Sequence, residues 1–566
     1  MASLSKSKHL FGFTSPRTLE KIIPELRLLD EKFKGKKWNT QTQIEFFDTL
    51  FLSNFYEGEK RPTNPALAAR DRITRAPKAL GFIQLTPEIN LTKAGKQLIS
   101  EKRLDEIFTK QLLKFQLPSP YHTQSNTIEF NVKPYLELLR LIKELGSISK
   151  LEIALFFLQL TNFNKFDFIK NKILSFRERR NRERRKEKRT SWRTFVSGEF
   201  VAEIKEIFHH EIVNNQFYTR ESEHSTFEKF IKTKESNMRD YADAFFRYIR
   251  ATELVTIDSK TMRIKISPSR KDDVNFILEN IDRHPMHFDS VKSFQNYLFD
   301  PDTLKLFSDN RDRLIDKIKS LSAEQVVLES KTIDELKDDL VALETEQKNK
   351  FVSDNIIKLK ENKLDDLNDI YLMFNKIINK EVPDAPLFLE WNVWRAFAAL
   401  NHTKEIAGNF IFDLDGMPLN TAPGNKPDIE INYGDFSCII EVTMSRGETQ
   451  FNMEGSSVPR HYGDLVNKLQ HNKAYCFFIA PKISEATKAF FFNLNKVHTK
   501  RYGGKTKIIP MDLYSFIEFF RVGIVQQFSQ VAILENWLEQ QWLYNQEAED
   551  EDIWFRRIQD GIQNWI

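Results

Sequence analysis

Residues 424–443, with the sequence GNKPDIEINYGDFSCIIEVT, restrict the fold of this chain more than any other stretch. Residues 429–433 alternate apolar and polar side chains, as a half-buried strand does. Residues 436–442 form a nearly continuous apolar run, which is typical of a buried strand. Gly434-Asp435 between the two runs is a tight-turn signal, so the stretch predicts a β-hairpin.

This predicted hairpin brings two acids together. If Gly434 and Asp435 are the turn residues, Asp428 lies directly opposite Glu441, and their Cβ atoms are about 5 Å apart on one face of the sheet. Like charges at opposite positions destabilise a strand pair, so a fold that keeps them there is expected to share a cation between them. Carboxylate oxygens suit Mg²⁺. We therefore predict a metal-assisted phosphoryl site that uses one or two magnesium ions.

The sequence on either side of the hairpin predicts an α/β sandwich around this metal-binding edge. Residues 387–400 have the pattern of an amphipathic helix and carry one acid, Glu390. Downstream, we predict a polar loop at 445–459, a helix at 460–470, strands at 474–480 and 507–511, and a helix at 513–520.

The hairpin acids also resemble a known motif. Pro427-Asp428, followed thirteen residues later by Glu441-Val442-Thr443, is similar to the PD-(D/E)xK nuclease core of restriction endonucleases. Over nearly its full length the chain resembles the AlwI family of type IIS restriction endonucleases, in particular a group that includes strand-nicking enzymes. The segments LFGFTSPRTLEKIIPEL, NPALAARDRITRAPKALGFI and EWNVWRAF carry this likeness.

The resemblance implies a Mg²⁺-dependent, sequence-specific enzyme that hydrolyses DNA a few base pairs from a short asymmetric site of GAGTC type. It implies that three acids form the metal shell and that two further residues act beside them. The metal-shell acids are Glu390, Asp428 and Glu441, and the further catalytic residues are Glu454 and His461.

One departure from the family pattern concerns charge. The lysine expected two residues after the second acid is Thr443 here. Its charge-stabilising role must therefore fall to another group or to a second metal ion, and Lys468 is a candidate. Two alternatives stay open: Glu454 is a solvated acid in a loop, or His461 is an ordinary residue at a helix start.

At 566 residues the chain is long enough for three to four domains. We predict a mostly α-helical DNA-recognition region with winged-helix subdomains at 1–290, a helical linker at 291–380, and an α/β restriction-endonuclease-like domain at 381–566. The linker prediction depends on its helical, highly charged sequence, which is poor in glycine and proline.

A basic helix predicted at 66–80 is the first candidate DNA-binding element. It follows a helix pattern at 40–55 and precedes the hairpin-like text FIQLTPEINLTKAG, which is a winged-helix order that places the basic helix in the major groove. Its candidate contacts are Arg70, Arg72, Arg75 and Lys78, and its predicted apolar face is Leu67, Ile73 and Leu80. The alternative is a solvated basic face.

Two further units follow. Residues 136–160 predict a helix-turn-helix with a glycine turn and a serine cap, and residues 241–268 predict a second helix with a hairpin wing. Between them, residues 177–189 hold nine basic residues against three acids. This run is either solvated surface or a phosphate-tracking segment, with Arg180 and Arg184 as candidate contacts.

Composition excludes several classes of protein. A net charge of +4 is not that of a simple polycation, and no CxxC motif supports zinc. Both cysteines, Cys438 and Cys476, lie in predicted buried strands and are expected to be core thiols. Without a long apolar run or leader, we expect a soluble, cytoplasmic protein that does not contact a membrane.

The expected partner is double-stranded DNA. One nuclease site cuts one strand at a time, so cutting both strands needs a second copy or a small nuclease subunit. The rival hypothesis is a non-catalytic winged-helix DNA-binding regulator with a degenerate nuclease fold, which Thr443 mildly favours.

Overall fold

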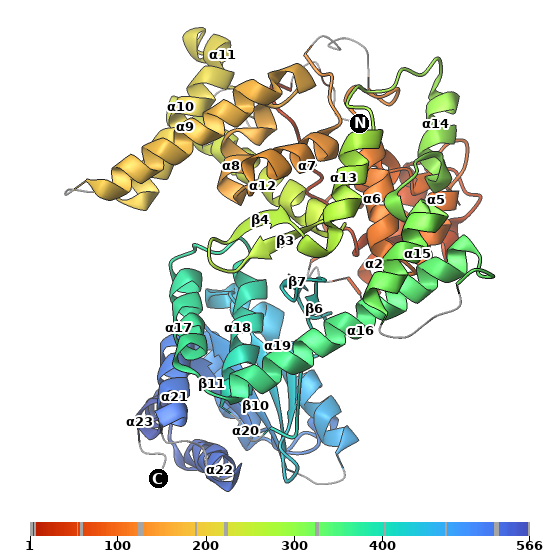
Figure 1. Cartoon of the computed structure of the whole chain (residues 1–566). Coiled ribbons are helices and arrows are strands. Elements are labelled where there is room, and N and C mark those ends of the chain that lie inside the picture. Colours follow the sequence, from red (N-terminus) through yellow and green to blue (C-terminus); the bar gives the residue numbers. More distant parts are fainter. Residues whose placement is uncertain are drawn as a thin grey trace. The chain divides into compact units, whose positions relative to one another are not determined.

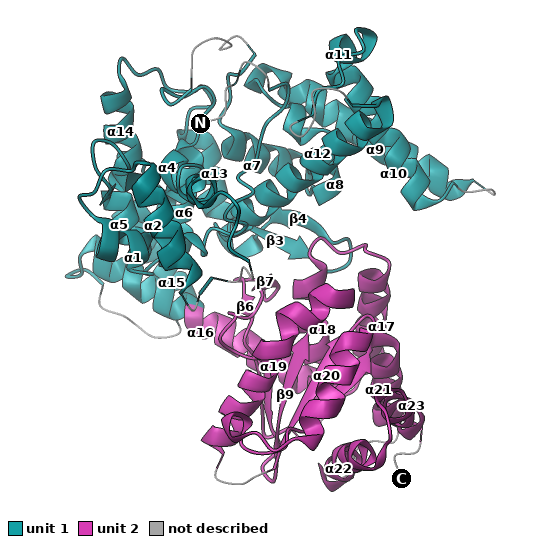
Figure 2. Ribbon diagram, turned by 180° about the vertical axis from the view of Figure 1, so that it is seen from behind, with its two compact units in different colours: residues 1–344 teal, residues 345–566 magenta. Residues whose placement is uncertain are grey.

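The computed structural model describes residues 4–563, apart from residues 5–6, 54, 57–59, 123–128, 187–189, 220–224, 323–327, 401–402, 470–472 and 526–530. The chain divides into two compact units, residues 1–344 and 345–566 (Figure 2). The division falls within helix α16 (Ile333–Lys360) and inside the stretch predicted to be a linker. In the described part of the chain, no helix combines the length and apolar character that crossing a bilayer requires.

The first unit is mostly helical and carries two small hairpins (Figure 1). Its helices are α1 (Ile22–Phe33), α2 (Thr40–Phe51), α3 (Pro65–Ile73), α4 (Ala76–Ala79), α5 (Lys93–Ile99), α6 (Leu104–Lys114), α7 (Pro134–Leu145), α8 (Lys150–Leu155), α9 (Phe166–Arg185), α10 (Trp192–Ile207), α11 (His209–Val213), α12 (Phe227–Arg250), α13 (Lys271–Asn280), α14 (Val291–Phe299) and α15 (Arg311–Leu321). The antiparallel hairpins are β1 (Ile83–Gln84) with β2 (Asn90–Leu91), and β3 (Val255–Asp258) with β4 (Arg263–Ile266).

The basic helix predicted at 66–80 is two helices, α3 and α4. The reason is Pro77, which stands in the first turn of α4. Proline favours a helix start over a helix interior, because it has no N–H to donate to the preceding turn. The prediction that Leu67 is buried is also wrong, since this side chain is 40 % exposed and Ala66 and Ala69 form the buried face with Ile73.

The predicted helix-turn-helix is present as α7 and α8. Gly146 ends α7 with φ +74°, and Ser149 caps α8 in a capping box with Glu152. The second helix is shorter than predicted, because it passes after Leu155 into a 3-10 turn at Phe157–Gln159.

The hairpin of β3 and β4 confirms the hairpin predicted within residues 241–268. Its loop is four residues long, because Asp258 pairs with Arg263 and the Met262 N–H donates back to the Asp258 carbonyl at 2.8 Å. The winged-helix arrangement of these units remains a prediction.

The second unit is built around a five-stranded mixed sheet in the order β11-β10-β9-β8-β5. Its strands are β5 (Glu405–Gly408), β8 (Ile429–Asn432), β9 (Ser437–Val442), β10 (Ala474–Ala480) and β11 (Ile508–Asp512). The last three are parallel, while β8 and β5 are antiparallel to their neighbours. A separate hairpin joins β6 (Ile411–Phe412) and β7 (Pro418–Asn420). Besides the second part of α16, the helices are α17 (Leu364–Ile378), α18 (Ala385–Ala399), α19 (Gly447–Lys468), α20 (Glu485–Lys496), α21 (Leu513–Val525), α22 (Val531–Glu547) and α23 (Glu551–Gly561).

Aromatic side chains fill the core of this unit. The Phe397 ring of α18 lies 5.3 Å from the Phe477 ring of β10 and 5.5 Å from the Phe516 ring of α21. Cys438 and Cys476 are buried free thiols, as predicted. The stretch predicted to be a helical linker at 291–380 contains a break between α16 and α17, where Asn362 has a φ of +51°.

The loop predicted at 445–459 is wrong, because α19 begins at Gly447 and continues through Pro459. Serines, glycines and a proline disfavour a helix locally, but tertiary burial outweighs this preference: Val458, Pro459, His461 and Tyr462 are all buried. The consequence for the site is direct. Glu454 is helical, and it stands two turns before His461 on the same helix.

Candidate functional site

The hairpin of β8 and β9 has the register predicted from the sequence. Ile429 pairs with Ile440, and Asn432 pairs with Ser437. The Tyr433 N–H donates to the Phe436 carbonyl at 3.0 Å, which closes the turn. Asp428 directly precedes β8, so continuing this register by one residue places it opposite Glu441.

A backbone or imidazole group holds each of the three acids predicted for the metal shell. Asp428 Oδ2 accepts a hydrogen bond from the Val442 N–H at 2.7 Å. Glu390 Oε2, from α18, accepts one from the Ala422 N–H at 3.2 Å. Glu441 Oε1 lies 2.7 Å from His461 Nδ1. The strand acid is thus joined to α19 through the imidazole.

The acids raise one another's pKa. Burial raises the pKa of Glu390 well above its usual range, and the charge of Asp428 raises it further. The pKa of Asp428 is also raised well above its usual range, first by burial and then by the charge of Glu441. For Glu441, burial and the charge of Glu454 raise the pKa. Four acids therefore form one electrostatically coupled cluster, which resists carrying its full charge at neutral pH unless a cation compensates.

The position of the missing lysine is part of this cluster. The Thr443 side chain is buried and hydrogen-bonds to Glu454, which partly offsets the effect of burial on the pKa of that acid. Burial, with the nearby charge of Arg460, lowers the pKa of His461 and favours the neutral imidazole. Lys468 is exposed in the last turn of α19. A hydroxyl group thus occupies the position where the resemblance leads us to expect an ammonium.

Sequence reasoning missed Arg460. Its Nη2 donates to the Gly424 carbonyl at 2.9 Å and lies 3.2 Å from His461 Nε2. Its charge lowers the pKa of Glu441 against the effect of burial. The sequence signal was weak, because Arg460 is the first residue of the helix predicted at 460–470 and no local pattern turned it toward the acids.

The donor set fits a hard divalent cation by its chemistry, since it consists of carboxylates that repel one another and of one imidazole. In the described residues, however, no group of three or more His, Cys, Asp or Glu side chains is arranged so that it could hold a metal ion. Hydrogen bonds to Val442, Ala422 and His461 occupy the acids instead. The magnesium site therefore remains a prediction.

The candidate contacts on α3 and α4 differ in their surroundings. Arg72 pairs with buried Glu25 from α1, and Arg75 pairs with Asp71 at 2.7 Å. Lys78 lies half-buried over the Tyr121 ring, and burial lowers its pKa. Arg70 is exposed. Of these four, Arg70 presents its charge most openly to solvent.

The basic run on α9 divides in the same way. Arg177 donates to Glu152 at 2.9 Å, and Arg179 donates to Glu199 at 3.0 Å. Arg180 stacks on the Trp192 ring, 4.7 Å from its centroid. Arg184 is exposed near the end of the helix. The first arginines thus contribute to the fold of the unit, and those near the end of α9 face solvent.

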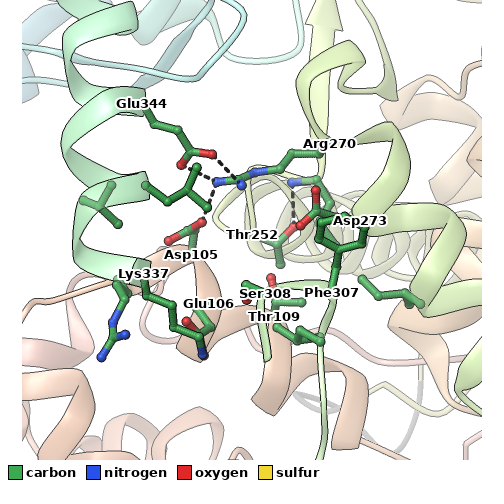
Figure 3. A pocket seen from close by; sticks show the side chains of 16 residues that line it. Asp105, Glu106, Thr109, Thr252, Arg270, Asp273, Phe307, Ser308, Lys337 and Glu344 are labelled. Carbon is green, nitrogen blue, oxygen red and sulfur yellow. Dashed lines mark hydrogen bonds and ion pairs between the residues drawn. The ribbon is translucent and has the colours of Figure 1, made fainter. Parts of the chain in front are cut away.

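A pocket in the first unit is the alternative site (Figure 3). Arg270 donates to both oxygens of Glu344, at 2.8 and 2.9 Å, and to Asp105 at 2.9 Å. Lys337 bonds to Glu106 at 2.7 Å. Since these lining charges neutralise one another, the cluster has the character of a structural ion-pair network that joins α16 to α6.

Replacing Arg270 by methionine should therefore destabilise the first unit. The change leaves buried Glu344 and partly exposed Asp105 without their arginine, and a broken buried pair typically costs about 3–5 kcal/mol. Urea unfolding measures the loss, and the double variant Arg270→Met/Glu344→Leu should recover part of it. The same substitution at Arg239, which forms an exposed pair with Glu235, is the control. Equal losses at both positions contradict a role for the buried network.

Acids and an imidazole gathered beside one hairpin of a mixed sheet are residue types that hydrolytic enzymes use to move protons. The chain belongs to the AlwI restriction endonuclease family, whose sequence model matches residues 78–519. It is therefore a restriction enzyme, a nuclease that acts on DNA, as the sequence analysis predicted.

Two solved structures are similar to parts of the chain. The small subunit (R.BspD6I2) of the heterodimeric restriction endonuclease R.BspD6I is 23% identical, with 35% of this chain and 97% of that chain covered and a TM-score of 0.28. The BpuJ1 endonuclease binding domain, in complex with pyrene- and phenanthrene-modified DNA, is 13% identical, with 54% and 99% covered and a TM-score of 0.32. A comparison with curated proteins found no match.

Proposed function

We propose that the chain is a Mg²⁺-dependent, sequence-specific endonuclease of type IIS, which cuts DNA a few base pairs from a short asymmetric site of GAGTC type. The observation that carries the proposal is the hairpin register, which sets Asp428 opposite Glu441. Glu390, Glu454 and His461 surround this pair through the bonds and charges described above. The chain would act in the cytoplasm.

In this proposal Asp428, Glu441 and Glu390 hold the magnesium ions of a PD-(D/E)xK site. When bound, such ions lower the pKa of the attacking water and stabilise charge on the scissile phosphate. His461 fixes the rotamer of Glu441 through its Nδ1 contact. Glu454 and Thr443 complete the polar wall on the side of α19.

Recognition is assigned to the first unit and cleavage to the second. The helix and hairpin units of the first are proposed as winged-helix modules that read DNA, with Arg70 and the end of α9 directed at phosphates. Among the described residues of the second unit we assign one catalytic acid cluster, so one chain would nick one strand. Cutting both strands would need a second copy or a small nuclease subunit.

Run-off sequencing of both strands tests the proposal. Plasmid is incubated with purified protein and Mg²⁺ at several protein concentrations, and the ends are sequenced. Breaks at a fixed offset from one short asymmetric sequence are expected. Cutting at random positions, or within a symmetric site, contradicts the type IIS assignment.

A non-catalytic DNA-binding regulator is the second candidate. Thr443, at the position of the expected lysine, favours it. This candidate predicts a sequence-specific gel shift together with plasmid that stays supercoiled in Mg²⁺. The same digestion therefore separates the two candidates.

The exposed arginines at the end of α9 give a further expected result. Replacing Arg182, Arg184 and Arg185 by alanine should flatten the salt dependence of DNA binding, since each lost phosphate contact lowers the slope by about 0.9. Fluorescence anisotropy across a salt series measures this slope. A triple alanine variant at Arg239, Arg521 and Arg557, which are paired with acids, removes the same charge elsewhere. If both variants show the same salt dependence of DNA binding, the end of α9 does not contact phosphates and is ordinary solvent-exposed surface.

A further inference from the structure

The acid cluster of the second unit lacks a lysine on its own strand. Thr443 on β9 contributes a hydroxyl to Glu454, and Lys468 is exposed in the last turn of α19. Hydrolysis of a phosphodiester places negative charge beside these carboxylates, which is unfavourable without a positively charged donor. The geometry of α19 indicates where such a donor is.

Arg460 is half-buried and directly precedes His461 on α19. Its Nη2 donates to the carbonyl of Gly424, in the segment between β7 and Asp428, at 2.9 Å. The same atom lies 3.2 Å from Nε2 of His461, whose Nδ1 contacts Glu441. The guanidinium is therefore fixed between the chain leading to Asp428 and the imidazole that holds Glu441.

This placement leaves part of the guanidinium available. Both contacts use Nη2, and within the described residues no acceptor is bonded to Nε or Nη1. A guanidinium has five N–H donors in a fixed plane, a geometry that matches two oxygens of a phosphate. Because Nη2 is held, the direction of the remaining donors is set before any substrate binds.

We infer that Arg460 is the phosphate-contacting cation of this site and takes the place of a lysine at position 443. The inference rests on the proposed nuclease function. In this inference one turn of α19 carries two functional groups: the His461 imidazole beside Glu441 and the Arg460 charge that faces the scissile phosphate. The site requires a positive charge at this point, and the planar guanidinium adds a contact to two phosphate oxygens.

Three variants test the inference by single-turnover cleavage of a duplex that contains the mapped site. Arg460→Met should lower the cleavage rate by about 10²–10³-fold, the usual loss for one stabilising donor. Arg460→Lys keeps the charge but loses the planar fork, so it should cut more slowly than the wild type and at least about tenfold faster than Arg460→Met. Adding Thr443→Lys to Arg460→Met should restore at least about tenfold, because residue 443 reaches the same cluster.

Controls separate this inference from the function on which it rests. Rates are measured well below the melting temperature of every variant, and DNA affinity is determined in parallel. A difference in cleavage rate then cannot come from unfolding or from weaker DNA binding. Arg521→Met removes an exposed arginine of the same unit and should cut normally. If Asp428→Asn is inactive but Arg460→Met cuts like the wild type, the inference fails and the proposed function stands. Failure of Thr443→Lys to restore cutting overturns it as well, because Arg460 would then serve only to hold Gly424.

Discussion

Replacing Asp428 by asparagine should abolish DNA cleavage and leave DNA binding unchanged. Asparagine keeps the shape of the side chain and an oxygen that accepts the Val442 N–H bond, so the hairpin is retained. It removes the negative charge that pairs with Glu441 around the proposed ion. Loss of a residue that acts as one unit with its neighbours typically costs more than about 10³-fold in rate.

The measurement is a plasmid digestion read beside a gel shift on the mapped site. Glu430→Gln is the matched control, because Glu430 lies two residues after Asp428, in β8, and accepts a hydrogen bond from Asn409. The control should cut normally. If Asp428→Asn cuts at the rate of the wild type, Asp428 is not a ligand and the assigned site is wrong.

Magnesium should stabilise the second unit, and the effect should disappear in Asp428→Asn. Burial and mutual repulsion raise the pKa of Glu390, Asp428 and Glu441 above their values in the unfolded chain. A folded state with raised carboxyl pKa values binds more protons than the unfolded state. These acids therefore stabilise the fold below about pH 4, and this stability is lost as the pH rises through their folded pKa values. A bound divalent ion removes the penalty.

The size of this effect follows from linkage. An ion at one hundred times its dissociation constant adds about 2.7 kcal/mol, which is a rise of about 5–10 °C in the melting temperature of a unit of this size. Without magnesium, Asp428→Asn should melt above the wild type, and the difference should grow as the pH rises through the raised pKa values of the acids. With magnesium at pH 8, this difference in melting temperature should become smaller or change sign. A wild type that magnesium does not stabilise contradicts the metal site.

Local chemistry determined the part of the site that the sequence predicted correctly. The register of β8 and β9 follows from two alternating runs and a two-residue turn, all within twenty residues, so Asp428 and Glu441 could be placed together without any knowledge of the rest of the chain. Glu390 was identified through the resemblance. Its helix forms close to the predicted residues, but it is not amphipathic, because residues 387–399 are all buried.

Tertiary packing decided what local patterns could not. The segment around Glu454 has the composition of a loop and becomes helical because burial of Val458 and Pro459 outweighs a poor local preference. This helix is what brings Arg460 and His461 to the strand acids.

The basic residues show the same division. The sequence analysis predicted four candidate DNA contacts on this stretch without distinguishing them: Arg70, Arg72, Arg75 and Lys78. In the structure, Arg72 pairs with Glu25, which is 47 residues away in the chain. A charge count is a property of composition, so the sequence by itself determined that these helices are basic. Which charges face solvent depends on partners distant in the chain, and only the tertiary structure decided that.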